Sequence, residues 1–228
     1  MSLWSDFLTN QHRVIDKWTH YFPAYERHFS KFVNTDVTFL EIGCFQGGSL
    51  QMWKRYLGPY AKIVGIDIDP TCMGQEEDQI SVRIGRQADT NFLQSVIDEF
   101  GPIDVVLDDG SHMMSDLRAS FNYLYPHVSR NGVYFIEDLH TAYWEEFGGG
   151  LRREGSFIEL CKNLIDDLNA DWSRGANIAD QFTRSTLSMH FYDSICAFEK
   201  GRTANRTSFR TGDPGAGPMT KSSLPVPD

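Results

Sequence analysis

Two pairs of adjacent acids follow two short apolar runs in the middle of the chain. Asp108 and Asp109 end the first run, and Glu137 and Asp138 end the second. Such runs are typical of buried parallel strands, and the ligands of open α/β sheets bind outside the carboxyl ends of the strands. We therefore expect the four carboxylates to converge at one edge of a sheet, in a crevice where the chemistry takes place.

Metal binding is the first chemistry that this cluster indicates. Carboxylates at neighbouring strand ends repel one another unless a cation lies between them, and Mg²⁺ binds about six oxygen atoms in octahedral geometry. The expected ligands are Asp109, Glu137 and Asp138. Because adjacent strand residues point to opposite faces, Glu137 and Asp138 can share one ion only where the strand has turned into a loop. Alternatively, Asp108 or Asp138 caps backbone N–H groups at a strand-to-helix turn.

His112 follows Asp109 by three residues and can face the same crevice. A histidine at a helix start is more often a cap or a packing residue. Beside a metal it becomes a candidate general base, because metal coordination lowers the pKa of a hydroxyl and an imidazole accepts protons near neutral pH. His112 and Asp109 are therefore the catalytic candidates.

A glycine-rich turn between two earlier predicted strands indicates a nucleoside-containing cofactor. Gly43, Gly47 and Ser49 lie in the turn from strand 37–43 into a helix, and Asp67 ends the next strand. Glycines let the backbone approach a ligand, the helix start binds an anionic group, and an acid at this position binds ribose hydroxyls. The G-x-x-x-G-G spacing differs from the G-x-G-x-x-G of dinucleotide sites, which favours S-adenosylmethionine, a cofactor without a pyrophosphate.

The segment from Gln87 to Asp89 follows a predicted third strand, 80–85, and is placed to contact an adenine edge. A second interpretation is that Asp89 or Thr90 caps the helix that follows, since both residue types are common N-caps. The two roles are compatible.

Strands and helices alternate along the chain, with helices expected over 91–100, 115–128 and 156–170. This alternation predicts an α/β fold with a Rossmann-like, doubly wound, mostly parallel sheet. The runs 186–192 and 194–199 predict a closing antiparallel hairpin. A loop with three glycines, 147–150, is a candidate lid.

Residues 1–34 are expected to form an N-terminal helical arm with an aromatic stripe, interrupted at Pro23. The stripe would pack on the domain or on another subunit, and we expect a homo-oligomer. Alternatively, the arm is a lid that places Lys17, His20 or Glu26 over the pocket. Residues 201–228 are rich in Gly, Pro, Ser, Thr and Arg, which predicts a disordered tail.

The composition excludes several classes of protein. The net charge of −10 disfavours nucleic acid and anionic lipid as partners. No apolar run approaches the roughly 20 residues of a membrane-spanning helix, and the N-terminus does not have the layout of a signal peptide. The four cysteines are scattered without a C-x-x-C pair, so neither a zinc site nor a disulfide framework is indicated. We expect a cytoplasmic protein with reduced cysteines.

The chain contains four motifs: E-I-G-x-x-x-G-G-S at 41–49, I-D-I-D-P at 66–70, D-D-G-S-H at 108–112 and E-D-L-H-T-A-Y-W at 137–144. Together they resemble the class I S-adenosylmethionine-dependent methyltransferases, and more narrowly the metal-dependent sugar O-methyltransferases of macrolide biosynthesis, the mycinamicin type. The similarity also takes in the segments 17–28 and 191–194, and so extends over roughly residues 15–200.

The resemblance implies a seven-stranded sheet with a reversed last strand in a methyltransferase domain, residues 35–200. It also implies Mg²⁺ on Asp109, Glu137 and Asp138, with His112 as the base that deprotonates one of two neighbouring sugar hydroxyls. The implied acceptor is a sugar or glycoside, with His140, Tyr143 and Trp144 as substrate contacts. The implied cofactor-binding residues are Glu41, Gly43, Gly47, Ser49, Asp67, Gln87, Asp89 and Asp108.

Two features depart from the family pattern, and three other functions stay open. Arg86 stands where an acid or a small polar residue would accompany the adenine, and we expect no separate N-terminal domain of the kind found in some macrolide enzymes, so the acceptor need not be a macrolide. The alternatives are a metal-dependent methyltransferase of a phenolic diol, a nicotinamide-dependent oxidoreductase and a non-catalytic binding module. The loop spacing disfavours the oxidoreductase.

Overall fold

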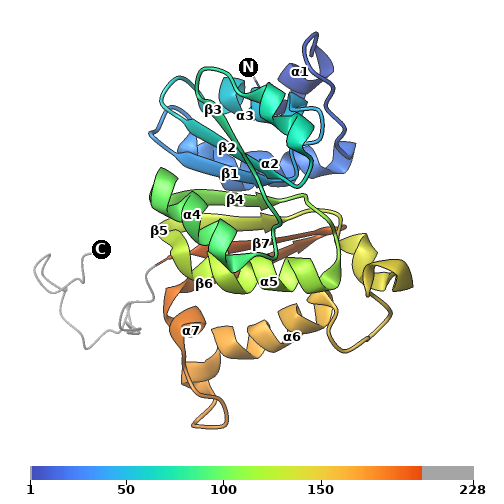
Figure 1. Ribbon diagram of the computed structural model, residues 1–228. Helices are drawn as coiled ribbons and strands as arrows, with labels where there is room; N and C mark the ends of the chain where they lie inside the picture. The colour runs from blue at the N-terminus through green and yellow to red at the C-terminus, as the bar shows by residue number, and fades with distance from the viewer. Residues whose placement is uncertain (1, 202–228) are drawn as a thin grey trace, which may run out of the picture.

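The computed structural model describes residues 2–201 and contains a seven-stranded sheet of order β3-β2-β1-β4-β5-β7-β6 (Figure 1). Strands β1 to β5 are parallel to one another, whereas β7 is antiparallel to both β5 and β6. The predicted mostly parallel sheet with a reversed last strand is confirmed. The strands are β1 (Thr38–Ile42), β2 (Lys62–Asp67), β3 (Ile80–Ile84), β4 (Ile103–Asp108), β5 (Val128–Ile136), β6 (Thr186–Tyr192) and β7 (Ile195–Lys200).

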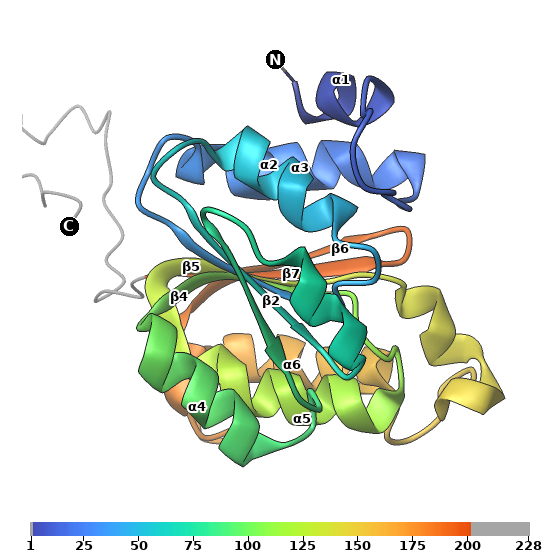
Figure 2. The same ribbon diagram turned by 45° about the horizontal axis from the view of Figure 1, so that its top comes forward.

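Helices cover both faces of the sheet (Figure 2). On one face pack α1 (Leu3–Leu8), α2 (Phe22–Phe29) and α3 (Gly48–Leu57). On the other pack α4 (Thr90–Phe100), α5 (Met114–Leu124), α6 (Phe157–Leu168) and α7 (Gln181–Ser185). Because both faces are covered, the inner strands are apolar at successive positions: Phe39 packs toward α2 and Leu40 toward α4. Short 3₁₀ turns are η1 (Thr19–Tyr21), η2 (Ser30–Phe32), η3 (Pro70–Gln75), η4 (Tyr125–His127), η5 (Leu139–Tyr143), η6 (Glu145–Phe147) and η7 (Ala170–Trp172).

Two sequence-based boundaries differ from the structure. The expected helix 115–128 ends at Leu124, because Pro126 cannot continue an α-helix and Val128 already begins β5. The expected N-terminal arm is helical only in part. Residues 10–18, here called the N-terminal strap, have no regular secondary structure, and Pro23 lies in the first turn of α2. The predicted tail lies outside the described residues, apart from Gly201.

Strand alignment brings the functional segments to one level. Ile42 of β1, Asp108 of β4 and Ile136 of β5 are in register, so the residues that follow them leave the sheet side by side. The ladder continues by one bond on each side, from Asp109 N–H to Ile42 O (3.0 Å) and from Glu137 N–H to Asp108 O (3.0 Å). Within residues 2–201, none of the helices has the length and apolar character needed to cross a membrane.

Candidate active site

A cleft of about 520 Å³ opens at the carboxyl ends of β1, β2, β4 and β5. Its walls come from the glycine turn after β1, the loops after β4 and β5, and the N-terminal strap. Three of the four acids predicted to converge, Asp109, Glu137 and Asp138, line this cleft together with His112.

Asp108 lies apart from the other three acids because alternate strand residues face opposite sides of the sheet. It is fully buried toward α5, where it accepts hydrogen bonds from Ser120 Oγ (2.7 Å) and the Tyr134 hydroxyl (3.0 Å). Burial raises the pKa of Asp108 from 3.8 to about 6, although these hydrogen bonds lower it. The structure therefore does not bring Asp108 to the surface of the cleft.

Glu137 and Asp138 both reach the cleft because the chain turns directly after β5. The strand ends at Ile136, and Asp138 has a φ of 54°, in the left-handed region. Tyr25 of α2 donates its hydroxyl proton to Glu137 Oε1 (2.6 Å), and the Tyr21 hydroxyl donates to Asp138 Oδ1 (2.6 Å). The strand has thus turned into a loop at Glu137 and Asp138, which is the condition under which both side chains can face one ion.

The two tyrosine hydroxyls were not predicted as part of the site. One signal was available in the sequence: Tyr21 and Tyr25 are four residues apart in the aromatic stripe and so share a helix face. A buried tyrosine usually needs a hydrogen-bond partner for its hydroxyl, whereas a phenylalanine does not. The stripe therefore packs against the sheet and also positions two of the acids.

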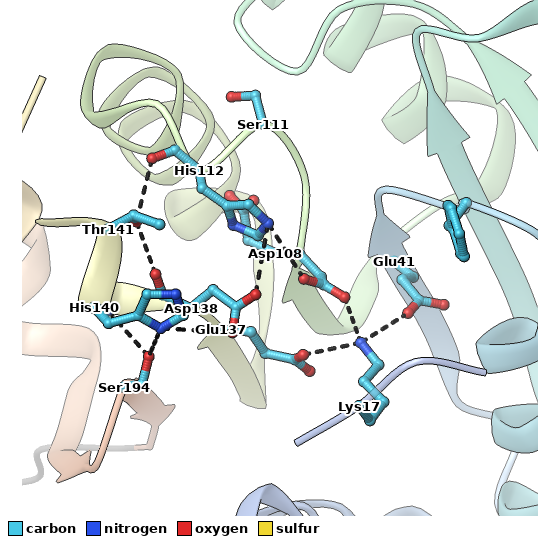
Figure 3. Close-up of polar contacts among 12 residues, drawn as sticks. Lys17, Glu41, Asp108, Ser111, His112, Glu137, Asp138, His140, Thr141 and Ser194 are labelled. Atoms are coloured by element: carbon cyan, nitrogen blue, oxygen red, sulfur yellow. Dashed lines mark hydrogen bonds and ion pairs between the residues drawn. The ribbon is translucent and has the colours of Figure 1, made fainter. Parts of the chain in front are cut away.

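Lys17 of the N-terminal strap extends its ammonium group into the middle of the acids (Figure 3). It donates hydrogen bonds to Asp109 Oδ2 (2.5 Å) and Glu137 Oε2 (2.9 Å), and lies 3.6 Å from Glu41 Oε1. Its side chain is only 2 % exposed. Burial alone would lower the pKa of Lys17, but the charges of Asp109, Glu137 and Glu41 raise it well above its ordinary value, so the group stays charged.

The donor atoms that remain form a site that fits a divalent cation. Asp109 Oδ1 and Asp138 Oδ2 lie 3.7 and 3.8 Å from His112 Nε2, and the three residues have ligand atoms within 4.8 Å of one another. The one ammonium of Lys17 cannot balance Glu41, Asp109, Glu137 and Asp138 together, and oxygen donors suit Mg²⁺. Of the three predicted metal ligands, Asp109 and Asp138 belong to this group, whereas both carboxylate oxygens of Glu137 accept hydrogen bonds from Lys17 and Tyr25.

His112 precedes α5 and has a φ of 57°, which turns its ring back toward the acids. Its Nδ1 is buried and has no hydrogen-bond partner, while Nε2 faces Asp109 and Asp138. Nε2 is thus the nitrogen at the wall of the cleft that can accept a proton from a ligand. The predicted proximity of His112 to Asp109 is thus present in the structure.

Glu41 is fully buried behind two lining residues of the cleft, Lys17 and Ser49, and has one oxygen without a hydrogen bond. Ser49 Oγ donates to Glu41 Oε2 (2.9 Å), whereas Oε1 is buried and makes no hydrogen bond. Burial raises the pKa of Glu41 to about 7 against the attraction of Lys17, and it also raises the pKa of Glu137. An unpaired buried acceptor beside a cavity is a natural partner for a cationic or N–H group of a ligand.

The glycine turn approaches the loop after β4 too closely for a side chain. A Cβ atom at Gly43, whose φ is 92°, would lie 2.2 Å from the Asp109 carbonyl oxygen. Asp67 Oδ2 accepts a hydrogen bond from the Cys44 N–H (2.7 Å) and so holds the turn to the end of β2. Gly47 is in the left-handed region, with a φ of 74°, directly before α3.

A smaller cavity of about 170 Å³ shares part of its lining with the cleft and is bordered by Arg86 and Gln87. Gln87 is tied into the loop after β4. Its Nε2 donates to Asp108 Oδ1 (3.1 Å), and its Oε1 accepts from the Ser111 N–H (2.7 Å). The segment after β3 therefore borders a cavity that adjoins the cleft, and its contact with an adenine stays a prediction.

Asp89 is exposed and lines neither of these two cavities. It caps α4, since Oδ1 accepts hydrogen bonds from the N–H groups of Asn91 (3.0 Å) and Phe92 (3.3 Å). The capping interpretation is confirmed, and a contact of Asp89 with the cofactor stays a prediction.

The predicted substrate residues lie in and directly after η5. His140 Nδ1 is 2.6 Å from Ser194 Oγ and 4.0 Å from Asp138 Oδ1, so it borders the acidic site. Trp144 is 45 % exposed and packs against His140, with ring centroids 4.7 Å apart. Tyr143 is 50 % exposed and lines a separate groove that also includes His140.

Of the three residues proposed for a lid, only Lys17 lines the cleft. Glu26 accepts a hydrogen bond from the Leu3 N–H (2.9 Å), and the His20 ring packs against that of Tyr21 at 4.6 Å. The strap also crosses the start of α3, where a Cβ atom at Gly48 would lie 2.1 Å from the Val14 carbonyl oxygen. The strap therefore covers the glycine turn.

The strand order, the reversed β7 and the cleft at the carboxyl ends define the class I methyltransferase fold, which this chain has. A putative caffeoyl-CoA O-methyltransferase from Staphylococcus aureus shares this fold at 13% identity, with a TM-score of 0.51 over 82% of this chain and 85% of the other. No protein-family model matches the sequence.

Within that class, the chain is homologous to sugar O-methyltransferases. It is 40% identical over 207 residues to a rhamnosyl-tetracenomycin-C 3'-O-methyltransferase of Streptomyces olivaceus, covering 84% of this chain and 53% of the relative. It is 38% identical to the mycinamicin VI 2''-O-methyltransferase of Micromonospora griseorubida, covering 80% of this chain and 49% of the relative.

A solved structure supports the same relationship. MycE, a methyltransferase of mycinamycin biosynthesis in complex with Mg, SAH and mycinamycin VI, superposes with a TM-score of 0.78 at 35% identity. The match covers 89% of this chain and 53% of MycE. The chain thus spans about half the length of the curated relatives that it matches.

Proposed function

We propose that this protein is an S-adenosylmethionine-dependent, Mg²⁺-dependent O-methyltransferase that acts on a hydroxyl group of a sugar or a glycosylated natural product. The observation that carries the proposal is the group formed by Asp109, Asp138 and His112, which lies in one cleft with the glycine turn after β1. A cation site and a nucleoside site would therefore border the same space.

In this proposal each part of the cleft has its own task. The glycine turn and Asp67 bind the nucleoside, and Glu41, whose Oε1 makes no hydrogen bond, binds the ammonium of the methionyl group. Asp109 and Asp138, with Glu137 beside them, hold Mg²⁺, which when bound supplies positive charge that lowers the pKa of an acceptor hydroxyl. His112 accepts the hydroxyl proton at Nε2, the nitrogen that faces both acids.

A glycoside is the favoured acceptor because the named relatives act on sugars of tetracenomycin and macrolide compounds. Two adjacent hydroxyls of a sugar could both approach a cation at Asp109 and Asp138. A phenolic diol offers the same pair of oxygens and is the second candidate. The exposed rings of Tyr143 and Trp144 can pack on either acceptor.

The test begins with calorimetric titration of S-adenosylmethionine and its demethylated product, with and without Mg²⁺. We expect both nucleosides to bind and methyl transfer to glycosides with vicinal hydroxyls to require Mg²⁺. His112→Gln should slow methyl transfer by about 10²- to 10⁴-fold, the usual contribution of a general base, without loss of nucleoside binding. The control is Asp78→Asn, which changes an exposed acid outside the cleft and should leave the transfer rate unchanged. Absence of nucleoside binding would refute the proposal, and transfer to catechols alone would select the phenolic alternative.

We further propose that residues 1–34 act as an arm that closes the cleft and that residues 35–200 form the methyltransferase domain.

We also propose that the protein is a cytoplasmic homo-oligomer. The four cysteines are unpaired, as is usual in a reducing compartment. Strand β6 forms one edge of the sheet and exposes Leu187 and Phe191, features that favour association. Sedimentation analysis should give a mass above that of one chain, and a monomer would contradict the oligomer.

A further inference from the structure

A second group of metal-binding side chains lies where α2 packs against the β6–β7 hairpin. It consists of His28 in the last turn of α2, His190 of β6 and Glu199 of β7. Their ligand atoms lie within 4.8 Å of one another, and none of the three residues lines the cleft. The group is therefore distinct from the acids around Lys17.

The hairpin register places two of these side chains together. Ser188 pairs with Glu199, and His190 pairs with Ala197, so His190 and Glu199 are diagonal neighbours on one face. Ala197 belongs to the core beneath α2, which identifies this face. From α2, His28 Nδ1 comes within 2.8 Å of Glu199 Oε1, and the two imidazole rings lie 4.8 Å apart.

Each imidazole also has a hydroxyl group beside its Nε2 atom. His28 Nε2 is 2.9 Å from the Tyr192 hydroxyl, and His190 Nε2 is 2.9 Å from Ser188 Oγ. A metal-bound imidazole almost always donates its other N–H group to an oxygen, which fixes the ring and its tautomer. Both rings have such a partner at Nε2, so Nδ1 is the nitrogen of each ring that is left for an ion. At His28 the ion would replace the contact between Nδ1 and Glu199 Oε1.

We propose that His28, His190 and Glu199 bind a Zn²⁺ ion, or a similar transition-metal ion, and leave one coordination position for water. Two imidazoles and one carboxylate are a donor set of zinc sites with three protein ligands, whereas Mg²⁺ prefers oxygen donors. Arg27 and Lys31 place positive charges near His28 and Glu199. Electrostatic attraction by Glu199 is therefore not sufficient to hold a cation, and binding depends on coordination by the two imidazoles. The ion would fasten α2, which carries Tyr25, to the hairpin.

The test is a competition of the full-length chain with a chromophoric chelator for Zn²⁺, with Co²⁺ absorption as a second readout. Ser188→Ala removes the hydroxyl beside His190 Nε2 and should weaken Zn²⁺ binding by roughly 10- to 100-fold, the usual cost of losing a residue that orients a ligand. His190→Ala and Glu199→Gln remove ligands and should weaken Zn²⁺ binding by at least as much. His190 is partly exposed, so its replacement is less disruptive than that of the buried His28.

Two control variants separate this site from the acidic cleft. Asp109→Asn should keep the Zn²⁺ affinity of the wild type, and so should His127→Ala, which removes an exposed histidine of η4. Zn²⁺ should raise the unfolding midpoint of the wild type but not that of His190→Ala. Binding that is lost in Asp109→Asn but kept in His190→Ala would overturn the proposal, as would absence of Zn²⁺ binding. None of these outcomes depends on methyl transfer.

Discussion

Lys17 determines the charge balance of the cleft, because it is the positive group that touches Asp109, Glu137 and Glu41. A buried ion pair adds little net stability when both partners are present, since both charges lose their hydration. Loss of one partner is costly, because the remaining charge stays buried without compensation. The contribution of Lys17 is therefore best measured by removing its charge alone.

Lys17→Met should destabilise the protein by about 3 kcal/mol or more, the usual cost of breaking a buried ion pair from one side. Mg²⁺ should restore part of this loss, since the freed carboxylates attract a cation. Thermal unfolding of both proteins, with Mg²⁺ and with a chelator, measures the two effects. Lys62→Met, at an exposed position, is the matched control. Equal stability of the Lys17→Met and Lys62→Met variants would contradict the assigned role of Lys17.

Asp108 should make the stability of the protein pH-dependent in a defined window. Burial raises its pKa from 3.8 to about 6 in the folded chain, so the unfolded chain releases the proton first as the pH rises. The stability that this group contributes is complete below about pH 4 and is lost as the pH rises through about 6.

Asp108→Asn removes this titrating group. Between about pH 4 and pH 6, the free energy of unfolding of the variant should therefore rise relative to that of the wild type. The expected gain is up to about 3 kcal/mol, because each of the roughly two pKa units corresponds to about 1.36 kcal/mol. Urea unfolding at several pH values gives this difference. Asp78→Asn should show no such trend, and parallel curves for Asp108→Asn and the wild type would argue against a raised pKa.

The N-terminal strap lies over the glycine turn and forms one wall of the cleft. Its backbone touches Gly48 at the start of α3, and Arg13 donates a hydrogen bond to the Gln75 carbonyl (2.8 Å) in η3. Gly48→Ala would place a Cβ atom 2.1 Å from Val14 O, so the strap must move away.

We expect Gly48→Ala to lower the unfolding midpoint and to weaken binding of S-adenosylmethionine, because the wall that contains Lys17 is displaced. Calorimetry and thermal unfolding provide the two measurements. Gly74→Ala is the control, since a Cβ atom there meets nothing within 4 Å. If the two alanine variants behave alike, contact with the strap does not shape the cleft.

The strands were predictable from the sequence and the strap was not. Strands β1 to β4 are mainly apolar runs that end at Gly or Asp, and β1 and β3, expected over 37–43 and 80–85, begin and end within one residue of expectation. The strap has no periodicity, and its course depends on contacts with residues more than sixty positions away. A position of Lys17 over the pocket was therefore only one alternative, and its contacts with Asp109 and Glu137 were not predicted.

At the scale of the whole molecule, sheet order explains why the sequence located the cleft. Strands β1, β4 and β5 are neighbours in the sheet although β2 and β3 separate β1 from β4 in the chain. Ligand sites of parallel sheets lie at the carboxyl ends of such strands, so Asp109, Glu137 and Asp138 could be placed before any geometry was known. Asp108 could not, since its direction depends on the exact residue at which β4 ends.

Because the ammonium group of Lys17 is buried beneath the strap, the rate at which a reagent modifies it reports how often the strap opens. An acetylating reagent should modify the exposed Lys31, Lys62 and Lys162 rapidly and leave Lys17, with a side chain 2 % exposed, almost untouched. Acetylation of Lys17 would then proceed at the rate at which the strap lifts. Peptide mass spectrometry over a time course would yield that opening rate, and modification of Lys17 as fast as Lys62 would show that the strap stands open.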